Sequence, residues 1–141
     1  MTELHPRLAA DCVQLGRFPL CHLLLLNDSS YPWFILVPDR DGIREIYQLN
    51  TADRQQLLDE SCRLSEFLMS SFKGDKLNVA AIGNLVPQLH LHHVVRYASD
   101  RAWPLPVWGR FPAVAYTDAA VAGMSERISA ADLVGFRQKG V

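Results

Sequence analysis

Residues 84–97 read NLVPQLHLHHVVRY, an apolar segment with one glutamine and three histidines between positions 88 and 93. The whole chain has only five histidines in 141 residues, so the imidazoles are concentrated here. The leucines and valines of the segment predict a strand over residues 87–97. Side chains alternate between the two faces of a strand. We therefore expect one face with Gln88, His90 and His92, and a second with Leu89, Leu91 and His93, the leucines facing a core.

The segments around this strand predict one α+β domain spanning residues 1–141. Apolar runs at 20–26 and 33–37, separated by the turn-forming letters NDSSYP, predict a hairpin. Apolar residues spaced three and four apart predict a helix from about 51 to 72, which Asn50 or Thr51 would cap. Other expected elements are a helical turn and short strand within 5–18, an extended piece at 43–50, a strand at 77–82 and a weaker helix at 117–136. This order favours an antiparallel sheet with one long helix packed on it and a C-terminal helix.

The composition is that of a globular protein, with 49% apolar and 21% charged residues. The net charge is −1, and no basic cluster is present, so nucleic acid is not an expected partner. No apolar run approaches the roughly 20 residues that span a bilayer, so we expect no membrane association. Three widely spaced cysteines without a Cys-x-x-Cys pair suit a reducing compartment, which predicts a cytoplasmic protein.

Three interpretations of the histidine strand compete. The imidazoles can be satisfied, half-exposed side chains of a sheet with no chemical role. They can bind a metal, but zinc needs at least three converging donors, Gln is a poor ligand, and His93 faces away. They can instead perform phosphate chemistry, because an imidazole nitrogen can attack phosphorus and carry a covalent intermediate while neighbouring donors steady the charged oxygens. The third interpretation is favoured, with no metal and no cofactor expected.

Two stretches resemble the histidine triad superfamily. The segment GNLVPQLHLHH (83–93) is similar to the family signature, in which His-φ-His-φ-His-φ-φ (φ apolar) lies on a phosphate-binding strand. LLLLNDSSYPWFILVP (23–38) is similar to the family hairpin, in which an Asn or Asp ends one strand and a short loop leads to an xLVxP strand. The resemblance covers about residues 15–98, and residues 99–141 form a Trp- and Pro-rich loop and a helix. The letters QLHLHH and PLPVWG resemble a bacterial subgroup grouped with dinucleoside polyphosphate hydrolases.

The resemblance implies a role for each matching position. His90 stands at the middle triad position, the nucleophile that takes up a nucleoside monophosphate. His92 stands at the third position, which binds phosphate oxygens and supports the leaving group. Gln88 stands at the first position, where the family has His, and Gln cannot carry a proton near neutral pH. The matching substrate-binding positions are Asn27 at the ribose, Asn84 near the phosphates, and Asn78 at the phosphates from the preceding strand.

The resemblance therefore implies a homodimeric HIT-type enzyme that hydrolyses or transfers at the α-phosphate of a nucleotide conjugate, such as a dinucleoside polyphosphate, through a nucleotidyl-histidine intermediate. The alternative is a nucleotide-binding module that Gln88 leaves with little or no catalysis. Arg96 shares the face of His92 by alternation, where it can add charge to the site or be solvated. Further expectations are Trp33 as a wall of the pocket, Trp103 and Trp108 as a cover for an apolar surface or dimer seam, and Glu60 and Glu66 on a solvated helix face.

Overall fold

The computed structural model of the chain describes residues 2–140. Its single sheet has six strands in the order β4-β5-β3-β2-β1-β6, and each neighbouring pair is antiparallel. The strands are β1 (Cys12–Arg17), β2 (Cys21–Leu26), β3 (Trp33–Pro38), β4 (Lys76–Ala80), β5 (Leu91–Arg96) and β6 (Arg137–Gln138). The helices are α1 (Pro6–Asp11), α2 (Thr51–Phe72) and α3 (Asp118–Ala130), with a short 3-10 turn η1 (Ile46–Gln48). The predicted α+β class and antiparallel sheet are confirmed.

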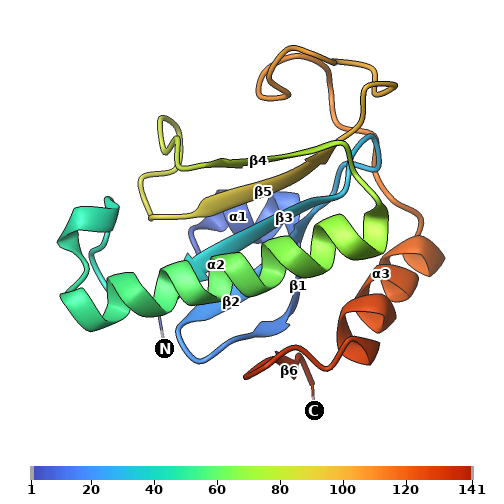
Figure 1. Cartoon of the computed structure of the whole chain (residues 1–141). Coiled ribbons are helices and arrows are strands. Elements are labelled where there is room, and N and C mark those ends of the chain that lie inside the picture. The colour runs from blue at the N-terminus through green and yellow to red at the C-terminus, as the bar shows by residue number, and fades with distance from the viewer. Residues whose placement is uncertain (1, 141) are drawn as a thin grey trace.

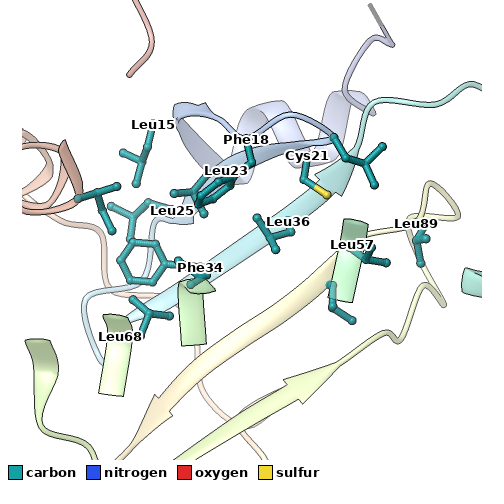
Figure 2. Close-up of a cluster of buried hydrophobic side chains, with 14 of the residues drawn as sticks. Leu15, Phe18, Cys21, Leu23, Leu25, Phe34, Leu36, Leu57, Leu68 and Leu89 are labelled. Atoms are coloured by element: carbon teal, nitrogen blue, oxygen red, sulfur yellow. The ribbon is translucent and has the colours of Figure 1, made fainter. Parts of the chain in front are cut away.

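The long helix covers one face of the sheet, as Figure 1 shows for α2. Asn50 begins α2 by accepting a hydrogen bond from the backbone N–H of Asp53, and Lys73 ends it in a left-handed conformation with φ 52°. Figure 2 shows the core that this packing encloses. It joins side chains that point from the sheet to side chains of the helix, including Leu23, Leu25, Phe34, Leu36, Leu57 and Leu68. Leu64 of the helix belongs to the same cluster.

The opposite face of the sheet carries a second buried cluster. Strand residues Leu24, Ile35 and Val94 pack there against Leu8 of α1 and against side chains of the loop that follows β5. Figure 1 accordingly places α1 on the far side of the sheet from α2, and the loop after β5 beyond the ends of β4 and β5. No helix within residues 2–140 is long and apolar enough to cross a membrane.

Several element boundaries differ from the prediction. Strand β5 begins at Leu91 and not at residue 87, because residues 81–90 form an irregular connection from β4. Residues 46–48 form a 3-10 turn inside the segment expected to be extended, and α3 stops at Ala130, about six residues early. Apolar and turn-forming letters indicate where an element exists, but its ends depend on what it packs against.

Glu60 was expected in solvent and is fully buried, so that prediction was wrong. Its two carboxylate oxygens each accept a hydrogen bond at 2.9 Å from a backbone N–H, of Leu20 and of Cys21, and the side chain of Gln56 donates to it as well. A buried carboxylate is tolerated when hydrogen bonds compensate for its lost hydration. Glu60 thus joins α2 to the start of β2, a contact between residues 39 or 40 positions apart.

Candidate active site

His90 and His92 lie at the start of β5, which runs between β3 and β4. His92 is paired with Ile35 of β3 on one side and with Ala80 of β4 on the other, while His90 directly precedes the strand. The two rings meet edge to face with their centroids 4.9 Å apart. Each residue is only 7% exposed, so water reaches these rings only through the cavities that border them.

The hydrogen bond of His90 fixes the position of its proton. Its Nδ1 lies 2.7 Å from the backbone carbonyl oxygen of Gln88, and a carbonyl oxygen can only accept. The Nδ1 atom therefore carries the hydrogen, and the neutral ring keeps its lone pair on Nε2. This is the arrangement that an imidazole nucleophile needs, since the attacking nitrogen must be unprotonated.

His92 has the opposite tautomer. The indole Nε1–H of Trp33 donates to its Nδ1 at 2.9 Å, and an indole nitrogen can only donate. The neutral His92 ring therefore carries its hydrogen on Nε2. Burial, together with smaller contributions from the neighbouring His90 and His93, lowers the pKa of His92 to about 3. The site thus combines one imidazole with a free lone pair and a second that offers an N–H to an oxygen.

His93 faces the other side of the sheet, as alternation predicted. It is fully buried, and its Nδ1–H donates to the carbonyl of Leu91 at 3.0 Å. Its Nε2 accepts a hydrogen bond of 2.7 Å from the hydroxyl of Ser61 on α2. His93 therefore anchors β5 to the long helix and takes no part in the site.

Two cavities meet at His92. The first, of about 460 Å³, is bordered by both rings and by the Gly83–Asn84 turn, where Gly83 has φ 68°. The second, of about 490 Å³, is bordered by His92, Trp33 and Asn27. Trp108 borders both, so it stands where they adjoin. Each cavity is large enough for part of a nucleotide.

The structure therefore brings four of the predicted site residues together and leaves two outside. His90, His92 and Asn84 border the first cavity, and Asn27 borders the second, where its side-chain oxygen accepts from the backbone N–H of Tyr116. Asn78 borders neither of them, and its side-chain oxygen accepts a hydrogen bond from Arg96 at 2.9 Å. Gln88 points its side-chain amide at the backbone of residues 3 and 5.

Arg96 was expected to lend charge to the site or to be solvated, and neither occurs. Its guanidinium is buried, donates twice to the carboxylate of Asp100 at 2.9 and 3.1 Å, and also bonds the carbonyl of Leu105. Another cavity, of about 660 Å³, is bordered by Arg96 and Asn78 and by neither His90 nor His92. Arg96 thus fixes the loop after β5 and does not supply positive charge to the histidine cavities.

Sequence reasoning missed that Trp108 lies against His92 at the site. Trp108 packs edge to face on both Trp33 and His92, with ring centroids 5.8 and 5.4 Å away. Trp33 was expected at the pocket wall, but its hydrogen bond to an imidazole 59 residues later in the chain has no local signal. Within residues 2–140, no group of three or more His, Cys, Asp and Glu side chains is placed to hold a metal ion.

The buried histidines predict that acid destabilises the fold. Burial lowers the pKa of His22, and it lowers the pKa of His92 to about 3 and of His93 to about 4. Below about pH 6.5 the unfolded chain takes up protons on these rings while the folded chain does not, so stability is complete above that pH and declines as the pH falls. We expect the free energy of unfolding to drop by about 1 to 2 kcal/mol for each of His92 and His93 between pH 7 and pH 5, with His22 acting in the same direction.

Urea unfolding at a series of pH values measures this decline. A His93→Gln variant, whatever its stability at pH 7, should show a smaller loss between pH 7 and pH 5 than the wild type. A stability that does not change over this range in the wild type would contradict the burial of neutral imidazoles.

Comparisons with known proteins agree with this fold. The family model described as the HIT domain matches residues 7–99. A histidine triad protein from Marinobacter aquaeolei VT8 is similar in structure, with 55% identity, a TM-score of 0.90, and coverage of 92% of this chain and 95% of that one. Histidine triad proteins from Bradyrhizobium japonicum and Sinorhizobium meliloti 1021 have 41% and 35% identity and TM-scores of 0.89. Each match covers 91% of this chain, together with 96% of the Bradyrhizobium protein and 95% of the Sinorhizobium protein. Among curated proteins, none matches the sequence.

Proposed function

The chain belongs to the histidine triad (HIT) family, and from that premise we propose that it hydrolyses or transfers at the α-phosphate of a nucleotide conjugate, such as a dinucleoside polyphosphate. The observation that carries this proposal is the pair of opposite tautomers at His90 and His92. One ring offers a lone pair and the other an N–H, and both border the same cavity. That combination suits a substrate that presents an electrophilic phosphorus together with charged oxygens.

The first step is a displacement at phosphorus. Nε2 of His90 attacks the α-phosphorus, forms an N–P bond, and the P–O bond to the leaving group breaks with its electron pair going to oxygen. The attacking ring of His90 becomes cationic, and the Gln88 carbonyl that accepts from its Nδ1–H stabilises this charge. Attack and departure must be nearly in line, which the rigid start of β5 favours.

The Nε2–H of His92 donates to a phosphoryl or leaving-group oxygen as negative charge grows there. Trp33 keeps that hydrogen on Nε2 by occupying Nδ1. Water, or another acceptor in a transferase, then attacks the phosphorus of the nucleotidyl-histidine. The N–P bond breaks, the electron pair returns to Nε2 of His90, and the attacking oxygen releases its proton to the surrounding water. The Gly83–Asn84 turn, at the wall of the same cavity, is suited to bind the phosphate oxygens.

The remaining assignments extend the proposal. Asn27 is proposed at the ribose, because it borders the cavity on the other side of His92. A homodimer is proposed from the family resemblance, and the exposed apolar side chains of Val79, Ile82 and Leu85 next to the free edge of β4 support an interface. A cytoplasmic location is proposed because Cys12, Cys21 and Cys62 are all free thiols. The binding of phosphates by Asn78 and a catalytic role for Gln88 stay predictions.

A panel of nucleotide conjugates tests the proposal. The full chain is incubated with diadenosine polyphosphates, adenosine 5′-phosphoramidate and an aryl ester of AMP, with and without a chelator. We expect release of AMP in each productive case, and in ¹⁸O-labelled water we expect the label in AMP, because water attacks the α-phosphorus.

A different outcome favours the alternative function. If nucleotides raise the melting temperature but no conjugate is cleaved, the chain is a nucleotide-binding module. Label found only in the leaving group would place the attack elsewhere and would contradict the role of His90.

A further inference from the structure

The side chain of Gln88 fastens the N-terminal segment of the chain. Its Oε1 accepts from the backbone N–H of His5 at 2.8 Å, and its Nε2–H donates to the backbone carbonyl of Glu3 at 3.1 Å. An amide supplies a donor and an acceptor side by side, and so it satisfies both groups of an extended backbone. The glutamine at the first triad position therefore binds residues 83 and 85 positions earlier in the chain.

The fastened segment leads directly into α1 on the face of the sheet that carries His92. The ring of His5 accepts from the backbone N–H of Arg7 at 3.1 Å, which begins the helix together with Pro6. Leu8 is buried in the cluster on this face, so α1 is fixed by packing against the sheet as well as by the contacts at its N-terminus. The short helix is thereby placed beside the histidine cavities and not free in solvent.

Arg7 is the side chain that this arrangement brings to the site. It borders both cavities that meet at His92, and among the described residues that border them it is the only Lys or Arg. Its ion pair with Asp11 is long, at 3.6 Å, and both side chains are more than half exposed. Such a pair contributes little, so the guanidinium is available to another anion.

A polyphosphate substrate needs positive charge at this place. Asp11 borders both cavities and Asp28 borders the second, so their negative charges would repel it, and the nearby Arg96 is committed to Asp100. A guanidinium binds phosphate oxygens with two parallel hydrogen bonds, which makes it suited to a chain of phosphates. We infer that Arg7 binds the phosphates beyond the α-phosphate of the substrate, and that Gln88 positions Arg7 by fastening residues 3–5. The inference rests on the proposed function only for the identity of the substrate.

Kinetics with two substrates test the inference. Arg7→Ala should raise KM for diadenosine tetraphosphate by about 10- to 100-fold, the usual worth of a charged hydrogen bond, with kcat changed far less. KM for adenosine 5′-phosphoramidate, which has no phosphate chain, should change less than about 2-fold. The KM increase for the tetraphosphate should shrink at high salt, where screening already weakens the contact in the wild type. Arg63→Ala on α2, which also removes one positive charge, is the matched control and should change neither KM.

The positioning role of Gln88 has its own readout. Gln88→Ala should raise KM for the tetraphosphate selectively, by less than Arg7→Ala does, and the double variant should be no worse than Arg7→Ala alone. Hydrogen exchange at the amide of His5 should speed up in Gln88→Ala and not in Arg7→Ala. Equal KM losses on both substrates, additive effects in the double variant, or unchanged KM values in Arg7→Ala would overturn the inference.

Binding measurements separate this inference from the proposed function. Calorimetry with AMP and ATP on the His90→Ala chain needs no catalysis. We expect ATP to bind more tightly than AMP, and Arg7→Ala in the same background to remove that preference. If the wild type cleaves no conjugate but the preference for ATP depends on Arg7, the proposed activity fails while the inference stands. If ATP binds no better than AMP, or the preference survives Arg7→Ala, the inference fails whatever the activity.

Discussion

His90→Ala is expected to lose turnover and the covalent nucleotidyl intermediate together. The variant removes the nitrogen that forms the N–P bond, and no other described side chain at the site combines a free lone pair with a hydrogen fixed by a carbonyl. The nearest imidazole, His92, keeps its hydrogen on Nε2 and accepts from Trp33 on Nδ1, so it cannot replace the nucleophile without breaking that bond. We expect a loss in kcat of at least about 1000-fold, typical for removal of a nucleophile.

Rapid mixing with a dinucleoside polyphosphate, followed by acid quench and mass spectrometry of the intact chain, measures the intermediate. The wild type should gain the mass of one nucleotidyl group, and His90→Ala should not. The matched control is His93→Gln, which alters the neighbouring histidine on the opposite face of the sheet and should still form the adduct. Undiminished turnover in His90→Ala, or an adduct mapped to His92 in the wild type, would overturn the assignment of tautomers and the mechanism built on it.

Asp100→Ala is expected to cost about 3 to 5 kcal/mol of unfolding free energy. The side chains of Arg96 and Asp100 are 2% and 3% exposed, so removal of the carboxylate leaves a buried guanidinium without its counter-charge. The same carboxylate also accepts from the backbone N–H groups of Tyr97, Ala102 and Trp103, and these would lose their partner. Although burial alone would raise the pKa of Asp100, the hydrogen bonds from Arg96 and these amides lower it, so the carboxylate is charged at neutral pH.

Urea unfolding of the wild type and of Asp100→Ala measures this loss of unfolding free energy. Asp11→Ala is the control, because it removes the Asp11 carboxylate from an ion pair whose side chains are 58% and 56% exposed. Pairs of that kind contribute about 0.5 kcal/mol or less, so Asp11→Ala should unfold near the wild-type midpoint. Equal midpoints for the wild type and Asp100→Ala would show that Arg96 is not desolvated and that the loop after β5 does not depend on this pair.

Local sequence patterns determined most of the elements, though not η1 or the short strand β6, and determined which way His92 and His93 point. The apolar runs predicted the β2–β3 hairpin. The three- and four-residue spacing of apolar residues predicted the full length of α2, from Thr51 to Phe72. Alternation along β5 placed His92 on one face and Leu91 and His93 on the other, because the direction of a side chain in a strand depends only on its position. The resemblance to the family motif then predicted His90 as the nucleophile.

The contacts that complete the site were decided by the tertiary structure alone. Trp33 meets His92 across the sheet, Gln88 meets the N-terminal segment, and Arg96 is buried because Asp100 folds back onto it. Side-chain periodicity covers a few neighbouring residues, whereas most of these partners lie tens of positions apart along the chain. A polar residue such as Glu60 or Gln88 therefore looks the same in the sequence whether it meets water or a buried backbone amide, and only the packing of strands and helices determines which.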